Sequence, residues 1–94
     1  MGSLIFNNTS RMFTLGDSQL NLSPREHAAL ECLIHKAGQT VGKADLLESI
    51  YGFEDDVNPS AIEIYVHRLR KKLENSSVTI TTLRGFGYLL HERK

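Results

Sequence analysis

Residues 62–88 place the tightest limits on what this chain can fold into. Within 62–73, apolar side chains recur at helical spacing along one stripe and basic side chains lie opposite, which predicts an amphipathic helix. A run rich in β-branched residues follows at 78–82, and two glycines flank Phe86, which predicts a β-hairpin with Arg84 at its tip. This pairing suits a DNA duplex, because the helix fits the major groove and the arginine fits the minor groove.

Short apolar runs near the N-terminus predict a small antiparallel sheet. The run 4–6 ends in a turn cluster at 7–10, and the run 11–15 is followed by a turn at 16–17. Residues 18–22 then alternate polar and apolar side chains, as a half-buried strand does. We therefore expect strands at this end of the chain, before the first helix.

Two helices are expected between this sheet and the basic helix. Ser23 can cap the first helix, Pro24 suits its first turn and Glu26 can complete a capping box. Gly38 is expected to stop this helix. The second helix is expected over 43–51, directly before a glycine.

The start of the basic helix has two candidate caps. Asn58 can cap a helix that opens at Pro59, whereas Ser60 with Glu63 forms a second capping-box pattern, and the sequence fits both. In either case strands are followed by three helices and a hairpin. We therefore predict one α+β domain over residues 1–94, a winged helix-turn-helix with an N-terminal antiparallel sheet and a C-terminal β-hairpin wing.

The charges are distributed unevenly, although they sum to zero. Residues 1–62 carry four Lys or Arg and eight Asp or Glu, a net charge of −4, while residues 63–94 carry seven and three, a net charge of +4. This asymmetry predicts an oriented electrostatic surface. A solvated charged helix would give the same count, so charge alone leaves both interpretations open.

Length and composition exclude several classes of protein. A chain of 94 residues has room for one modest core and not for a deep substrate cavity as well. Its apolar runs are too short to cross a membrane, and its N-terminus lacks the pattern of a secretory signal. Its single cysteine, Cys32, cannot form an internal disulfide. We therefore expect a cytoplasmic domain with no membrane partner.

An enzyme is not expected. No glycine-rich phosphate loop or pair of acids stands out, and Cys32 lacks a convincing histidine and carboxylate partnership. His27, Glu31 and His35 share one helical face at a spacing that could hold a metal, but a solvated face is the simpler interpretation. We expect no cofactor and no metal.

The exposed side of the basic helix carries side chains that suit DNA. Arg68 is the best candidate for reading a base, since a guanidinium can grip guanine with two hydrogen bonds. Ile64 lies in the middle of this polar side, where an apolar group could meet a thymine methyl. His67, Arg70 and Lys71 are better suited to phosphates, which position the helix without reading sequence.

These residues resemble a known family, the DNA-binding effector domain of OmpR/PhoB-type response regulators. The resemblance covers about 4–90, with its most specific parts at 66–73 and 82–88 and support from 23–26 and 46–52. It implies a sequence-specific transcription regulator that binds tandem direct repeats of double-stranded DNA. In such proteins a receiver domain accepts phosphate from a sensor kinase. No receiver is present here, so we interpret the chain as the effector domain alone, monomeric in isolation and dimeric on DNA.

The resemblance also assigns roles by position. It makes Arg68 the base-reading arginine, Ile64 the apolar base contact and Arg84 the wing arginine. Together with the helix face, it predicts DNA contacts for Tyr51, Ser60, Ile64, Tyr65, His67, Arg68, Arg70, Lys71, Thr82, Arg84 and Tyr88. It further implies a loop that faces RNA polymerase or its sigma subunit, formed by Gly52, Phe53, Glu54, Asp55, Asp56, Val57 and Asn58.

Some positions depart from the family pattern. His67 stands where arginine is frequent, Tyr65 where histidine is common and Ser60 where some members carry arginine. Fewer phosphate contacts give a shallower fall of affinity with salt. We therefore expect modest affinity for one domain and a large contribution from tandem sites. The alternative is a winged-helix module that binds a protein and no DNA, which the zero net charge and the acidic loop leave open.

Overall fold

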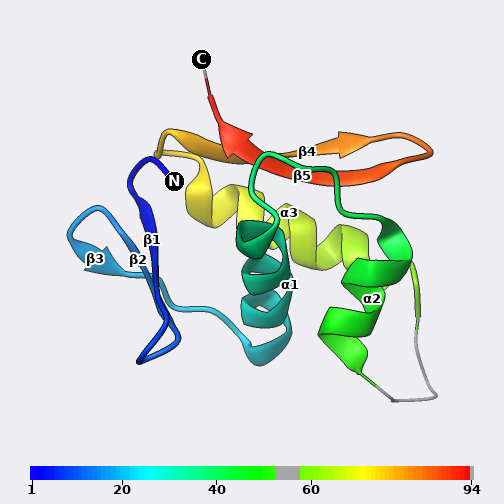
Figure 1. The fold of residues 1–94 in the computed structure, drawn as a ribbon, viewed down its shortest axis with the longest axis horizontal. Helices are drawn as coiled ribbons and strands as arrows, with labels where there is room; N and C mark the ends of the chain where they lie inside the picture. The colour runs from blue at the N-terminus through cyan, green and yellow to red at the C-terminus, as the bar shows by residue number, and fades with distance from the viewer. Residues whose placement is uncertain (53–57, 94) are drawn as a thin grey trace.

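The computed structural model describes residues 1–52 and 58–93, and Figure 1 shows how their elements are arranged. A sheet, three helices and a hairpin follow one another along this described part of the chain. The elements are β1 Leu4–Asn7, β2 Met12–Leu15, β3 Ser18–Gln19, α1 Pro24–His35, α2 Lys43–Tyr51, α3 Ala61–Leu73, β4 Val78–Leu83 and β5 Gly87–Glu92. The predicted α+β winged-helix architecture is confirmed.

The N-terminal sheet has the order β1-β2-β3, with antiparallel pairs. Leu4 and Phe13 point into the core, and the Phe6 and Phe13 rings lie 4.7 Å apart between their centroids. Because side chains alternate across a strand, Ile5 falls on the opposite, exposed face. The third strand is shorter than the predicted run 18–22, since the chain leaves the sheet to reach the start of α1.

The predicted start of α1 is confirmed in detail. The Ser23 hydroxyl accepts a hydrogen bond from the Glu26 backbone N–H, and the Glu26 carboxylate accepts one from the Ser23 backbone N–H. Pro24 occupies the first turn, where its missing N–H costs nothing. The helix ends at His35, and Gly38 takes a positive φ of 80° in the turn that follows.

At the start of α3, the structure selects one of the two candidate caps. The Asn58 side-chain oxygen accepts hydrogen bonds from the Ser60 backbone N–H at 3.1 Å and from the Ser60 hydroxyl at 2.7 Å. Ser60 itself has a helical backbone and makes no side-chain cap. The Ser60–Glu63 capping box is therefore not formed.

The core lies between the helices and the hairpin. The predicted inward stripe of α3, formed by Ile62, Val66, Leu69 and Leu73, is fully buried. It packs with α1 and with β4, and Figure 1 shows the hairpin running across one side of the helices. Further core side chains come from α1, α2 and the hairpin: Leu30, Leu33, Leu46, Ile50, Val78, Ile80 and Leu90.

The wing is fixed to the body near its tip. Val41, in the connection between α1 and α2, forms an antiparallel bridge with Tyr88 of β5. The Val41 N–H donates to the Tyr88 carbonyl at 2.8 Å, and the Tyr88 N–H donates to the Val41 carbonyl at 2.9 Å. At Gly87, a Cβ atom would stand 2.0 Å from the Val41 carbonyl oxygen. Only glycine lets the two backbones approach this closely.

Candidate nucleic-acid interface

The side of α3 opposite the core is exposed, as predicted. Ile64 is 52% exposed, and His67 and Lys71 lie on the same exposed side. The Arg68 side chain is 57% exposed. An apolar side chain surrounded by cations is a surface that can meet both base edges and phosphates of a duplex.

The wing tip protrudes as a tight turn. The Phe86 backbone N–H donates to the Leu83 carbonyl at 2.9 Å, and Gly85 takes a φ of 81° between them. Arg84 is exposed, and Phe86 is 77% exposed. Sequence reasoning placed Arg84 at the tip but gave Phe86 no role. Its position between two glycines of a hairpin was the available signal.

A groove of about 670 Å³ lies between the wing and the helices. Its lining residues are Lys43, Glu63, Thr82, Leu83, Arg84, Gly85, Phe86, Gly87 and Tyr88. A DNA strand that passes from a major groove filled by α3 to a minor groove entered by the wing would run along such a groove. The sequence analysis did not single out Lys43. This cation lies in the first turn of α2, where the free helix N–H groups also favour a phosphate.

Arg70 is half-buried and Thr82 is exposed, and the two side chains are hydrogen-bonded to each other. The Arg70 Nε donates to the Ile80 carbonyl at 2.7 Å, and its Nη2 donates to the Thr82 hydroxyl. β4 lies beside α3 and, in the described part of the chain, pairs with β5 alone, so the carbonyl groups on its other edge are open to the arginine. Within the domain, Arg70 therefore links α3 to the wing, and its expected phosphate contact stays a prediction.

Tyr51 and Tyr88, for which the resemblance implies DNA contacts, are buried in the free domain, and those contacts stay predictions. The Arg25 guanidinium lies over the Tyr51 ring, 4.6 Å from its centroid. The Tyr88 hydroxyl donates to the Glu63 carboxylate. Both rings fill space where α2 and the wing meet the core, so their apolar bodies are used in packing. The Tyr65 ring is half-buried, and its hydroxyl accepts a hydrogen bond from Arg25 at 3.4 Å.

The Tyr88 contact makes an alkaline pH dependence testable. Burial of the hydroxyl, and then its hydrogen bond and proximity to the Glu63 carboxylate, raise the pKa of Tyr88 from 10.0 to about 12. The neutral hydroxyl is thus favoured in the folded state. This contribution is complete below pH 10 and is lost as the pH rises from 10 toward 12. We expect the wild type to lose roughly 2–3 kcal/mol more than Tyr88→Phe over this range, measured by urea unfolding. Parallel losses in the two proteins would contradict this assignment.

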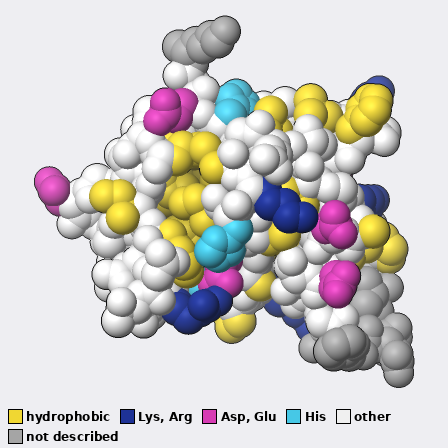
Figure 2. Space-filling model, in the orientation of Figure 1, with side chains coloured by type: hydrophobic (Ala, Val, Ile, Leu, Met, Phe, Trp, Pro, Cys, Tyr) yellow, Lys and Arg dark blue, Asp and Glu magenta, His cyan; other side chains and the backbone are white. Residues whose placement is uncertain are grey.

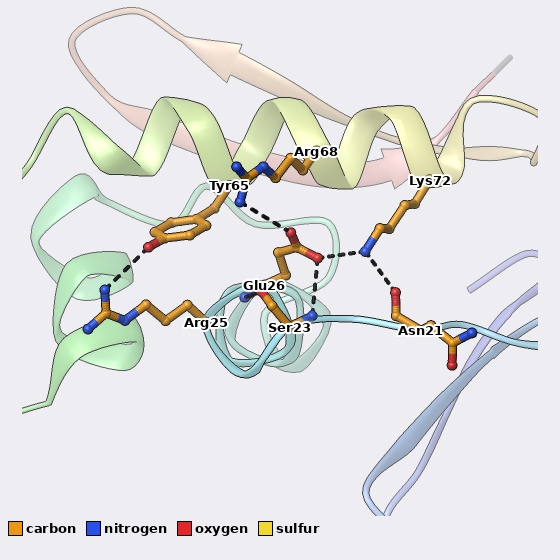
Figure 3. A network of polar contacts seen from close by, with 7 residues as sticks. All are labelled: Asn21, Ser23, Arg25, Glu26, Tyr65, Arg68 and Lys72. Atoms are coloured by element: carbon orange, nitrogen blue, oxygen red, sulfur yellow. Dashed lines mark hydrogen bonds and ion pairs between the residues drawn. The ribbon is translucent and has the colours of Figure 1, made fainter.

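A buried carboxylate lies behind the exposed side of α3. Glu26 is 3% exposed, and its Oε1 accepts hydrogen bonds from the Lys72 Nζ at 2.7 Å and the Ser23 N–H at 3.2 Å. The Arg68 Nη1 stands 3.9 Å from its Oε2 (Figure 3). Burial alone would raise the pKa of Glu26, but Lys72, the Ser23 N–H and Arg68 together lower it below 4.5. Glu26 is therefore ionised at neutral pH. The sequence indicated its part in the helix cap but not its contacts with the two cations of α3.

Other predicted residues lie as follows. Ser60 is exposed and bonded to Asn58. Of the predicted polymerase-facing loop, Gly52 ends α2 with a φ of 62° and Asn58 precedes α3, while 53–57 lie outside the described residues. On the face shown in Figure 2, acidic and basic side chains are interspersed, so this face does not carry a single sign of charge.

Glu31 lies at the centre of the histidine face of α1. Glu31 pairs with Arg11, and its carboxylate also lies 3.9 Å from the His27 Nδ1 and 4.0 Å from the His35 Nε2. The described residues contain no group of three or more His, Cys, Asp or Glu placed to hold a metal ion. Within residues 1–52 and 58–93, no helix has the length and apolar character needed to cross a membrane.

Comparison with known proteins identifies close relatives. Residues 17–90 match the family described as transcriptional regulatory protein, C terminal. The transcriptional regulatory protein TctD of Salmonella typhimurium is 46% identical over 90 residues, which cover 96% of this chain and 40% of TctD. The response regulator protein PmrA of Pseudomonas aeruginosa is 39% identical over 87 residues, 93% of this chain and 38% of PmrA. The chain thus spans about 40% of the length of these relatives.

Solved structures share the fold. The DNA-binding domain of Klebsiella pneumoniae RstA, determined in complex with the RstA box, is 32% identical with a TM-score of 0.77, over 96% of this chain and 92% of that one. The DNA-binding domain of the response regulator AdeR, determined in complex with an intercistronic region, has a TM-score of 0.82 at 20% identity, over 98% of this chain and 97% of that one. The second likeness concerns the fold alone.

Proposed function

This chain belongs to the transcriptional regulatory protein C-terminal family, the winged-helix domains of OmpR/PhoB-type response regulators, and we propose that it grips DNA with α3 in the major groove and its wing in the minor groove. Its function is sequence-specific DNA binding in transcription regulation. The observation that carries the docking mode is the exposed Ile64 and Arg68 side of α3, beside a wing that projects Arg84.

The following roles are proposed for side chains of α3, α2 and the wing. Arg68 reads guanine and Ile64 contacts a thymine methyl. Arg84 enters the minor groove, where a narrow A·T-rich segment attracts a cation. Phosphate contacts come from Ser60, Tyr65, His67, Lys71 and, from the groove below the wing, Lys43. Arg70, Thr82 and Tyr88 act indirectly, by holding the wing against α3.

The experiment first selects a preferred duplex for the wild type from random oligonucleotides. Affinity for this duplex and for an unrelated one is then measured at one salt concentration. Arg68→Ala should reduce the ratio of the two affinities roughly 5- to 150-fold, because one bidentate base contact is lost. Arg84→Ala should weaken both affinities more evenly. Lys36→Ala, a cation at the far end of α1, serves as the control for lost charge.

The outcome separates the two candidate functions. If neither arginine variant changes DNA binding, while a protein partner is lost, the chain is an interaction module and the DNA role is wrong. The wing and α3 would then form a protein-binding surface. A change in either arginine variant that Lys36→Ala does not share supports the docking proposed here.

Assembly and partners form a second part of the proposal. We propose that the domain is monomeric alone and that two copies bind tandem direct repeats, each adding to the affinity through a shared DNA. The loop at 52–58 is proposed to face RNA polymerase or its sigma subunit, and a sensor kinase is proposed to act through a receiver domain in the whole protein. Sedimentation of the domain with duplexes carrying one or two half-sites tests the assembly, since a second copy should bind only the longer duplex.

A further inference from the structure

One side chain lies between α1 and the base-reading side of α3. Among the described residues, Glu26 is the buried charged residue, and its two carboxylate oxygens have different partners. Oε1 is held by Lys72 and by the Ser23 N–H at hydrogen-bond distance, whereas Oε2 faces Arg68 (Figure 3). The carboxylate is thus fixed at one oxygen and open toward the guanidinium at the other.

The two cations are held with different strength. The Lys72 Nζ donates to Glu26 at 2.7 Å and also to the Asn21 carbonyl at 2.7 Å, so Lys72 is anchored at two points. The Arg68 Nη1 stands at 3.9 Å, beyond hydrogen-bond length, on a side chain that is 57% exposed. The charge of Glu26 therefore attracts Arg68 without holding it in a hydrogen bond. When Arg68 moves away, Glu26 still keeps its hydrogen bond from Lys72.

We propose that Glu26 is a positioning residue for sequence readout: it orients Arg68 toward the base edges and holds it back from phosphates, without touching DNA. This inference rests on the proposed base-reading role of Arg68. A free arginine on a cationic surface binds any phosphate, which adds affinity without selectivity. A nearby carboxylate competes with single phosphate contacts, whereas the two-point contact with guanine outcompetes it.

Glu26→Gln tests this role with little risk to the fold. Glutamine is also accepted at this position of a capping box, and its oxygen can still accept from Ser23 and Lys72. The negative charge that aims Arg68 is lost. We expect the ratio of affinities for the selected and the unrelated duplex to fall by roughly fivefold, in the range that coupled neighbours show. We also expect the Arg68 Nε–H resonance of ¹⁵N-labelled protein to shift and broaden, while the thermal unfolding curve keeps its cooperativity.

The control variant removes one negative charge at the C-terminal end of α3. Glu74 is exposed directly after α3, and its side chain faces neither Arg68 nor Lys72 in any ion pair that the structure shows. Glu74→Gln should strengthen binding to both duplexes alike and leave their ratio unchanged. An equal fall of the ratio in Glu74→Gln and Glu26→Gln would overturn the positioning role, since general charge would then account for it.

A double-mutant cycle separates this inference from the function on which it rests. In an Arg68→Ala background, Glu26→Gln should have no further effect on the affinity ratio. A fivefold fall in that background would overturn the positioning role while Arg68 remains the base reader. If Arg68→Ala alone leaves the ratio at the wild-type value, the base-reading role fails, and the positioning role fails with it. An unchanged ratio in Glu26→Gln, beside a reduced ratio in Arg68→Ala, would overturn the positioning role alone.

Discussion

Gly87→Ala is expected to destabilise the domain by about 3 kcal/mol or more and to abolish tight DNA binding. An added Cβ would stand 2.0 Å from the Val41 carbonyl oxygen and 2.8 Å from its carbon, and both are backbone atoms. The residue also has a φ of 140°, which alanine rarely adopts. The bridge to Val41 must open, so the wing loses its support. Urea unfolding and DNA titration at low temperature measure the two effects.

Gly85→Ala provides the matched control. Gly85 also has a positive φ, of 81°, but among the described residues other than its chain neighbours no atom lies within 4 Å of an added Cβ. Only the backbone strain remains, at about 1–2 kcal/mol. If the two alanine variants lost the same stability, the close approach of Gly87 to Val41 would not be what fixes the wing.

Leu69→Ala should strongly destabilise the domain. Leu69 is fully buried between the two arginines that precede and follow it in sequence. Removing its side chain leaves a cavity and is expected to cost about 2–5 kcal/mol, a large part of the roughly 5–15 kcal/mol that stabilises a typical domain. Chemical unfolding monitored by circular dichroism measures the loss. DNA affinity should fall only as far as the folded fraction falls.

Ile64→Ala is the companion variant on the opposite side of the same helix. Because Ile64 is 52% exposed, its truncation should change the unfolding free energy by no more than about 0.5 kcal/mol. Its effect should appear in DNA affinity, through loss of the apolar base contact. A large loss of stability in Ile64→Ala, or none in Leu69→Ala, would mean that the assigned faces of α3 are reversed.

The parts of the fold set by local pattern were predictable from the sequence. The capping box of Ser23 and Glu26 involves neighbours on one turn, and the buried stripe of α3 follows from the period of the helix. The exposure of Ile64 followed from the same period. Such features depend on residues close in sequence, so their geometry is nearly fixed by spacing.

The parts that depend on contacts between distant segments were not predictable in this way. Tyr51 and Tyr88 carry both an apolar ring and a polar hydroxyl, so sequence alone does not say which one decides their placement. Arg70 turned toward the open edge of β4, and Glu26 gained Lys72 from another helix. Each outcome required knowing which elements lie side by side. The roles of the predicted residues on DNA stay proposals until the variants above are measured.

The bridge between Val41 and Tyr88 makes the stability of the wing depend on the folded helices. A two-stranded hairpin alone is only marginally stable in water, so the wing depends on a body that is already folded. A peptide of residues 78–92 should therefore be largely unstructured. In the intact domain, loss of the helical core removes the wing in the same cooperative step. A heat-unfolded domain therefore lacks both the folded α3 and the wing.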